Sequence, residues 1–334
     1  MKKKTIVLII LDVMAIFCLL LAYGPNEKFR DMFITTAMST KSHQYLARVL
    51  YSEKQIEEVL KKNYTEDFKE ETKPADITFK PSNEKVYENE YEEQILNHEE
   101  GQLYKLIEFD EKNYHVYLTV IYDASRIKTM KSSFYGTNGE YLSKMANKNG
   151  AIVAINGGGF TDVGGMGNGA KAADIFIKDG EIIENHSGKP ENIIGFNNNN
   201  VLVLGRMTAQ EAIEKGIRDA VCFGPYLIMN GKKANLVGNG GYGTHPRTAI
   251  GQRKDGIVLL LTVEGNGSKY GFRGGATMQD LVNIFERYNA YNASNLDGGA
   301  SSVLYINGEV VNDPVAYSSS GERSLPNGWI IKWK

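Results

Sequence analysis

Hydrophobic and polar residues follow three successive patterns along the chain, and each predicts a different kind of structure. The first is an apolar run from Thr5 to Tyr23, which follows Lys2-Lys3-Lys4 and contains one charge, Asp12. Its length just reaches the ~17–25 residues that span a bilayer. The preceding lysines predict an N-terminus inside the cell. We therefore expect residues 1–25 to form a cytoplasmic tip and a transmembrane anchor, with the remaining chain outside the cytoplasm.

A cleaved signal peptide is the alternative interpretation of this segment. Ala22-Tyr23-Gly24 has the small-x-small form of a cleavage site, but Pro25 at the new N-terminus disfavours cleavage. Asp12 would cost ~2.5–3.5 kcal/mol at the centre of a membrane helix. We expect it nearer the cytoplasmic end, with the many Leu, Ile and Phe residues offsetting its cost. An uncleaved anchor is the preferred interpretation.

The second pattern has apolar residues three and four positions apart and predicts helices over residues 26–63. Ser52 and Gln55 have the spacing of a capping box. We expect this part to be a juxtamembrane helical stalk. The next segment, residues 64–100, holds twelve acidic and four basic residues together with Pro74 and Pro81. That composition is typical of a linker.

From residue 101 onward the third pattern, strand-like alternation, dominates, as in Tyr114 to Tyr122. Helices are expected over Tyr141–Lys148, from a capping box at Thr208 to about Ala220, and from Thr277 to Tyr288. We therefore predict that residues 101–334 form one mixed α/β (α+β) catalytic domain, largely of antiparallel or mixed β-sheet with a few packed helices. Four turn pairs predict its hairpins: Asp179-Gly180, Asn230-Gly231, Asp255-Gly256 and Asn307-Gly308.

Composition excludes several classes of function. A net charge of −2 argues against a general nucleic-acid binder. The chain contains neither a phosphate-binding Gly-x-x-x-x-Gly-Lys-Ser/Thr sequence nor the dinucleotide spacing Gly-x-Gly-x-x-Gly, so no nucleotide cofactor is expected. No Gly-x-Ser-x-Gly element is present, and the five histidines lack zinc-site spacing. Cys18 and Cys222 are not expected to pair.

Four polar segments stand where strand-like apolar runs begin or end. In the segment from Asn295 to Ser302, a carboxylate, two glycines and two hydroxyls share one turn. Glycines let backbone amides approach a ligand closely, so this turn suits a site that binds an oxyanion and transfers protons. The alternative for this segment is an ordinary strand–turn–strand, with Asp and Gly chosen for turn geometry. The other three segments are Ala154–Phe160, His245–Gly251 and Thr262–Gly265.

In this order, and with a closing Gly321-Glu322-Arg323, the segments resemble the phosphodiester glycosidase family over roughly residues 100–334. The resemblance implies a hydrolase that acts on a sugar-1-phosphodiester in a surface glycan, with α-linked N-acetylglucosamine 1-phosphate as one candidate linkage. The chain departs from the family twice. Glu264-Gly265-Asn266 stands where the family usually has Asp-Gly-Arg, and Ala300 stands where it usually has Gly. The first departure lengthens a carboxylate arm and removes a cation, so substrate choice can differ.

Hydrolysis at an anomeric carbon generally uses two carboxylates around the scissile bond. We predict Asp297 as the catalytic carboxylate and Glu264 as its partner acid/base, because both follow strong strand-like runs. Weaker candidates are Asp162, Asp174 and Glu322.

A phosphodiester also needs a cation or backbone amides. Arg247 is the first choice, because a guanidinium matches phosphate geometry with two parallel hydrogen bonds. Arg323 is the second choice and His245 an auxiliary. No cofactor is required; a divalent cation beside Asp297 and Glu264 is compatible with the chemistry, but no ligand spacing calls for it. The remaining predicted binding groups are Asn156, Gly157, Gly158, Gly298, Gly299, Ser301 and Ser302, with residues 164–169 as a loop over the site.

Two other functions remain open at this stage. A non-catalytic envelope protein that binds or assembles polysaccharide would keep the glycine-rich scaffold without needing the carboxylates. A hydrolase that splits the P–O bond instead of the C–O bond is the third possibility. The joint presence of Arg247, Glu264 and Asp297 favours the glycosidase.

Overall fold

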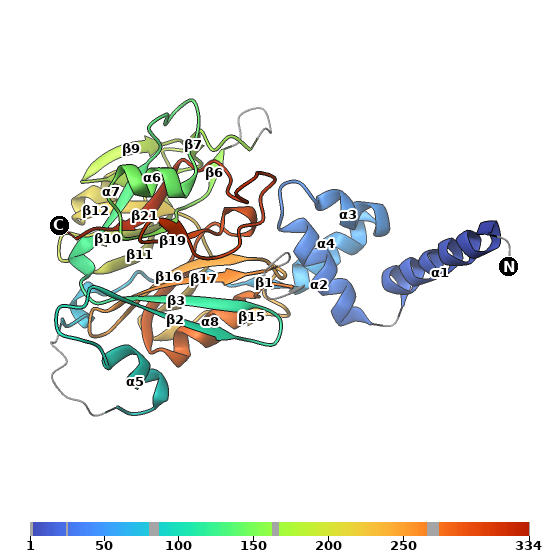
Figure 1. Cartoon of the computed structure of the whole chain (residues 1–334), viewed down its shortest axis with the longest axis horizontal. Helices are drawn as coiled ribbons and strands as arrows, with labels where there is room; N and C mark the ends of the chain where they lie inside the picture. Colours follow the sequence, from blue (N-terminus) through green and yellow to red (C-terminus); the bar gives the residue numbers. More distant parts are fainter. Residues whose placement is uncertain (1–2, 25, 80–86, 162–166, 266–273, 334) are drawn as a thin grey trace. The chain divides into compact units, whose positions relative to one another are not determined.

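The computed structural model describes residues 3–24, 26–79, 87–161, 167–265 and 274–333. The chain divides into two compact units (Figure 1). The first unit comprises Met1–Glu66, Asn235–Thr244 and Thr277–Gln279. The second comprises Asp67–Ala234, His245–Ala276 and Asp280–Lys334.

The first unit is helical, as the spacing of its apolar residues predicts. Ser52 and Gln55 form the expected capping box at the start of α4, each bonding the backbone N–H of the other. A small core of Ile34, Ala47, Ile56 and Val59 joins the three helices that follow α1. A short strand pair, β1 (Tyr64–Thr65) and β15 (Leu236–Val237), completes the unit. The helices are α1 (Lys3–Tyr23), α2 (Glu27–Met38), α3 (Gln44–Leu50) and α4 (Glu53–Lys62).

The predicted transmembrane anchor is not supported. Its residues do form a helix, α1. Asp12 lies beside the midpoint of this helix, not toward its cytoplasmic end as expected, and a carboxylate is most costly there. Among the described residues, no helix combines the length and the apolar character that crossing a membrane requires.

The acidic segment over residues 64–100, expected as a linker, is tied to the second unit from Asp67 onward. Thr72 exchanges hydrogen bonds with Leu204, its N–H lying 2.9 Å from the Leu204 oxygen and its Oγ1 3.0 Å from the Leu204 nitrogen. Acidic side chains of the segment also contact the second unit, because Glu71 pairs with Lys215 and Glu70 pairs with Lys232. The segment also contains a 3₁₀ turn (Pro74–Asp76) and α5 (Glu90–Leu96).

Three large antiparallel sheets make up most of the second unit, together with helices, which confirms the α+β class. The seven-stranded sheet has the order β14-β13-β18-β16-β17-β3-β2. Its strands are β14 (Lys232–Lys233), β13 (Tyr226–Met229), β18 (Ala290–Asn295), β16 (Arg247–Arg253), β17 (Val258–Glu264), β3 (His115–Ile121) and β2 (Tyr104–Asp110).

The other two sheets have five strands each. We name each after one of its interior strands. The β21 sheet is β20 (Glu309–Val310), β19 (Leu304–Ile306), β5 (Val153–Asn156), β21 (Asn327–Ile331) and β4 (Ile127–Lys131). The β10 sheet is β11 (Leu202–Met207), β10 (Glu191–Asn197), β12 (Ile217–Cys222), β8 (Ile175–Lys178) and β9 (Glu181–Asn185). A separate pair joins β6 (Phe160–Thr161) to β7 (Lys171–Ala172).

All four predicted hairpins form. Asp179-Gly180, Asn230-Gly231 and Asn307-Gly308 join β8 to β9, β13 to β14 and β19 to β20, and all six residues have positive φ. Two successive positive φ values are what a type I′ turn requires. At Asp255-Gly256 only the glycine has a positive φ, and the turn from β16 to β17 is correspondingly longer.

Two of the three helices predicted for this domain match closely: α6 (Leu142–Lys148) and α8 (Met278–Arg287). The third, α7 (Ala209–Glu214), begins at the Thr208 capping box but ends six residues before Ala220. Gly216 has a φ of +72° and stops it. Residues 217–222 instead form β12, a fully buried central strand that period-3.6 reasoning cannot separate from a helix.

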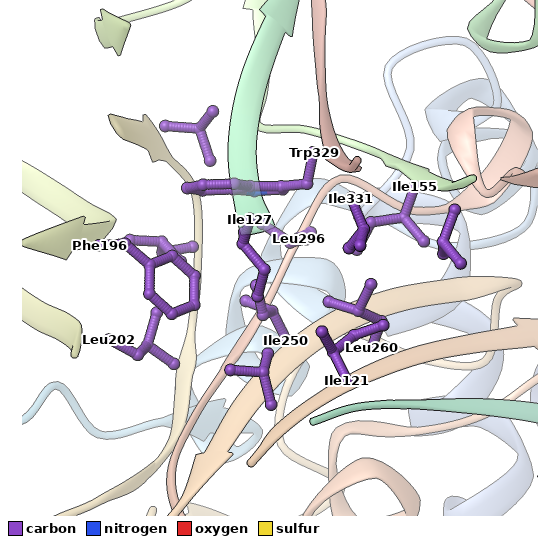
Figure 2. Close-up of a cluster of buried hydrophobic side chains, with 14 of the residues drawn as sticks. Ile121, Ile127, Ile155, Phe196, Leu202, Ile250, Leu260, Leu296, Trp329 and Ile331 are labelled. Carbon is purple, nitrogen blue, oxygen red and sulfur yellow. The ribbon is translucent and has the colours of Figure 1, made fainter. Parts of the chain in front are cut away.

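One hydrophobic core fills the space between the three sheets (Figure 2). Ile250 and Leu260 reach it from the seven-stranded sheet, Trp329 from the β21 sheet and Phe196 from the β10 sheet. The rings of Phe196 and Trp329 meet edge to face, with centroids 5.6 Å apart. Because all three sheets depend on this core, their strand ends are held in a fixed relation.

Truncating the central indole should test this arrangement. We expect Trp329→Ala to lower the free energy of unfolding by about 3–5 kcal/mol, since a large buried aromatic is removed. Trp333→Ala is the matched control: Trp333 is 65% exposed, so a change within about 0.5 kcal/mol is expected. Urea denaturation of both variants measures this; equal losses would show that Trp329 is not central to the core.

Candidate active site

Strand direction brings three of the predicted functional segments to one edge of the seven-stranded sheet. β16 begins at Arg247, which lies opposite Val263 on antiparallel β17, so Glu264 ends β17 at the same edge. β18 is also antiparallel to β16 and ends at Asn295, opposite Ala249. The turn that contains Asp297 therefore emerges beside Arg247 and Glu264.

The buried side chain of Asn156 joins this edge to the β21 sheet. Its Nδ2 donates to the backbone oxygen of Asp297 at 2.6 Å, and its Oδ1 accepts from Thr248 Oγ1 at 2.7 Å and from the Val303 N–H at 3.3 Å. The Asp297 N–H in turn lies 3.3 Å from the oxygen of Gly157. Asn156 thus positions the Asp297 turn; it is fully buried and its amide is used within the protein.

The two predicted catalytic carboxylates have different surroundings. Asp297 is half-buried, and its Oδ1 accepts from the Gly298 N–H at 3.1 Å. Glu264 is 1% exposed, and its Oε1 accepts from the Tyr117 hydroxyl at 2.9 Å and from the Asp313 N–H at 2.7 Å. Glu264 is therefore held rigidly by neighbours, whereas Asp297 is the more accessible of the two.

Arg247 is a buried guanidinium, whose Nε donates to the oxygen of Ala276 at 3.1 Å. The backbone around Pro246, the residue that precedes Arg247, is tightly packed. The Gly299 N–H donates to the Pro246 oxygen at 2.8 Å, and a Cβ on Gly298 would lie 2.8 Å from that oxygen. His245 forms a backbone bridge with Ala276, next to the arginine. Glycine is required here because the Asp297 turn passes so close to the start of β16.

The backbone amides of these glycines fall into two groups: those that donate to a protein acceptor and those that have no acceptor among the described residues. Gly159, Gly298 and Gly299 donate to protein acceptors: the Cys222 oxygen at 3.1 Å, the Asp297 carboxylate and the Pro246 oxygen. The amides of Gly157 and Gly158 have no acceptor among the described residues. Those two remain as donors for oxygen atoms of a ligand.

Further unused polar atoms lie in the segments that meet here. The Ser301 and Ser302 hydroxyls are buried, and neither has a hydrogen-bond partner within the described part of the chain. The same holds for both amide atoms of Asn327, which is 1% exposed and packs so closely on Gly157 that a Cβ there would overlap its Oδ1. An unpaired buried polar group costs about 1–3 kcal/mol. Several in one region are expected where a polar ligand binds.

Asn327 and Tyr117 were not predicted from the sequence. Asn327 precedes the apolar run Gly328–Ile331, so the rule that selected Arg247, a polar residue at the start of an apolar run, applies to it as well. Tyr117 lies inside the apolar strand β3, and only the pairing of β3 with β17 brings its hydroxyl to Glu264.

The contacts of Glu322, Arg323 and Asp174 involve neighbours other than those of Asp297 and Glu264. Glu322 is buried and accepts from the N–H and hydroxyl of Ser143 at 2.9 and 2.6 Å, so it caps the first turn of α6. Arg323 lies over the Phe160 ring at 4.5 Å, a cation–π contact. Burial, followed by repulsion from Glu191, raises the pKa of the Asp174 carboxyl at the start of β8.

Asp162, Asn266 and the first part of the expected loop over the site, residues 164–166, lie outside the described residues. Within the described ranges, no group of three or more His, Cys, Asp or Glu side chains is placed to hold a metal ion. The expectation about cofactors stays a prediction.

Matched substitutions compare Asn156, whose side-chain amide bonds other protein groups, with Asn327, whose side-chain amide has no partner within the described residues. Asn156→Leu should lower the free energy of unfolding by several kcal/mol, because it leaves the Thr248, Val303 and Asp297 groups unpaired. Asn327→Leu should leave stability unchanged or raise it, since it removes two unpaired atoms, and should raise KM or lower kcat for the substrate. Thermal unfolding and steady-state kinetics measure both effects; a strongly destabilised Asn327→Leu would assign that residue a structural role.

Comparison with known proteins agrees with this geometry. Residues 149–332 match the model of the phosphodiester glycosidase family. An uncharacterised protein derived from the SPbeta prophage of Bacillus subtilis (strain 168), YomE, is 30% identical over 205 residues, which cover 58% of this chain. The match spans only 30% of that relative's length. The zebrafish N-acetylglucosamine-1-phosphodiester alpha-N-acetylglucosaminidase catalytic domain, auto-inhibited by its pro-peptide, has a similar fold. Its TM-score is 0.58 at 18% identity, over 71% of this chain and 86% of that one. The chain therefore belongs to the phosphodiester glycosidase family.

Proposed function

We propose that the chain is a hydrolase that cleaves the glycosidic C–O bond of a sugar-1-phosphodiester. The observation that carries the proposal is the convergence of Arg247, Glu264 and the Asp297 turn at one edge of the seven-stranded sheet. A cation for the phosphate and two carboxylates for the sugar are the groups that this reaction needs. Membership of the family supports the same reaction.

In the proposed reaction, water adds to the anomeric carbon as the bond from that carbon to the phosphate oxygen breaks. The leaving group is a phosphate monoester, which is a much weaker base than an alkoxide, so it departs with little protonation. Arg247 and the amides of Gly157 and Gly158 stabilise its negative charge. Asp297 accepts the proton from water or stabilises the developing sugar cation, and buried Glu264 assists it.

The substrate class is a sugar joined through phosphate to another sugar or a polyol in a surface glycopolymer. This part, and a location outside the cytoplasm, rest on the family resemblance. Glu264-Gly265-Asn266 in place of Asp-Gly-Arg removes a cation from this region, which favours a substrate that differs from that of other family members.

Removing the charge of each carboxylate tests the assignment. We expect Asp297→Asn to lower kcat by roughly 10²–10⁴-fold, the usual contribution of a general acid or base. Glu264→Gln should also lower kcat while the protein stays folded. The matched control is Glu322→Gln, whose carboxylate caps α6: it should lose about 1 kcal/mol of stability and keep its turnover.

Sugar release from a panel of sugar-1-phosphodiesters measures these effects. Full turnover by a folded Asp297→Asn variant would refute the role of Asp297. A folded wild-type protein that binds glycopolymer and releases no sugar would point to the polysaccharide-binding alternative.

The position of bond cleavage needs a separate measurement. Hydrolysis in oxygen-18 water should place the label in the released sugar, because water attacks the anomeric carbon. Mass spectrometry of both products decides the question. Label in the phosphate would show P–O cleavage and overturn the proposed reaction.

A further inference from the structure

The second unit contains a polar cavity of about 310 Å³ at the end of the β21 sheet away from the candidate active site. It is lined by residues that begin β4, end β8 and follow β21. The candidate site lies at Asn156, where β5 ends opposite Gly328, whereas the cavity lies beyond Ile331, opposite Ile127. The volume is at the lower end of the range for small-molecule sites.

Positive charge dominates the lining. Arg126, Lys128, Lys178 and Lys332 all face the cavity, and Asp179 is its single acidic lining residue. This concentration is local, because the whole chain has a net charge of −2. Ser125, Thr129, Asn149 and Ile330 complete the lining. The first three use their side-chain donors within the protein, with Ser125 Oγ donating to Asp123, Thr129 Oγ1 to Asp219 and Asn149 Nδ2 to the Met145 oxygen, so the charged side chains set the character of the cavity. A cavity with such a lining is suited to an anion with several oxygen atoms.

The structural need for counter-ions accounts for only part of this charge. Asp219 is fully buried behind the cavity, and it already accepts from the Thr129 N–H at 3.0 Å and pairs with Arg218. Lys128 lies 3.8 Å from Asp219 and 3.4 Å from Asp179, and it shares Asp179 with Lys178.

Lys332 stands apart from that network. It forms no ion pair in the described part of the chain, and its side chain is half-buried beside the cavity. Arg126 pairs with Asp123 at 2.9 Å, and Lys128 and Lys178 both pair with Asp179, so Lys332 is the lining cation that has no ion pair among the described residues. A lysine held against a cavity without a counter-ion is the clearest sign of an anion site here.

We infer that this cavity binds a phosphate group of the glycopolymer at a distance from the linkage that is cleaved; the inference rests on the proposed function. Ile331 lies four residue steps along β21 from Asn327, or about 13 Å at ~3.3 Å per residue. A polymer with several phosphodiester repeats, running over the surface of the domain, can present one phosphate to Arg247 and another to this cavity at the opposite end of the β21 sheet. The cavity strengthens the binding of long substrates and takes no part in the chemical step.

Charge reversal at Lys332 tests the inference on the full chain. Lys332→Glu should raise KM roughly tenfold for a phosphodiester-linked polymer, the loss expected for one charge-assisted contact. KM for a monomeric sugar-1-phosphodiester and kcat for both substrates should not change. Lys189→Glu, an exposed lysine outside the cavity, is the matched charge control, and Lys332→Gln separates loss of charge from repulsion.

A binding measurement tests the cavity even if no substrate is turned over. Calorimetric titration with inorganic phosphate should show weaker binding to Lys332→Glu than to wild type or Lys189→Glu. Unchanged phosphate binding together with unchanged polymer KM overturns the inference, and so does an equal rise of KM for polymer and monomer. Weakened phosphate binding with unchanged polymer KM would identify free phosphate as the ligand and overturn the polymer assignment. If wild type cleaves nothing yet binds phosphate through Lys332, the proposed function fails and the anion site stands.

Discussion

The buried amide of Asn156 joins the sheets on which the candidate site is built. One side chain contacts the Asp297 turn, the second residue of β16 and the residue that precedes β19. Such a fully bonded amide in a low-dielectric interior is strong and directional, and losing any of its bonds is costly. The position of Asp297 relative to Arg247 is therefore determined by the interior of the domain and does not depend on the surface loop alone.

The polar groups around Asn156 fall into two classes. Glu264, Asn156 and three of the glycine amides are committed to protein partners, which gives the site a rigid frame. The Gly157 and Gly158 amides, two serine hydroxyls and the Asn327 amide are uncommitted within the described residues. A site for a charged and hydroxylated substrate needs both classes, because preorganised donors stabilise developing charge without reorganisation.

Local chemistry made much of the fold predictable. Two adjacent residues that tolerate positive φ define a hairpin at Asn307-Gly308, and reciprocal side-chain bonds define the helix start at Thr208. Arg247, Glu264 and Asp297 were predictable as candidates because each interrupts an apolar run. Their proximity, however, follows from antiparallel pairing between strands that are distant in sequence. Tyr117 reaches Glu264 across 147 positions, and no local pattern encodes such a contact. The predicted end of α7 was wrong for a related reason: a buried central strand and a buried helix have the same apolar composition.

The place of β21 in its sheet has a consequence for biosynthesis. This strand, Asn327–Ile331, lies between β5 and β4, and it follows the other described strands of the domain in sequence. β5 and β4 are therefore joined only through residues 327–331, which leave the ribosome about 170 to 200 residues after these two strands. Until then β4 and one edge of β5 stay unpaired, and the Trp329 position in the core stays empty. Domains whose early strands wait for a late partner expose unpaired edges during synthesis, so this domain completes its fold only after translation of its final strand.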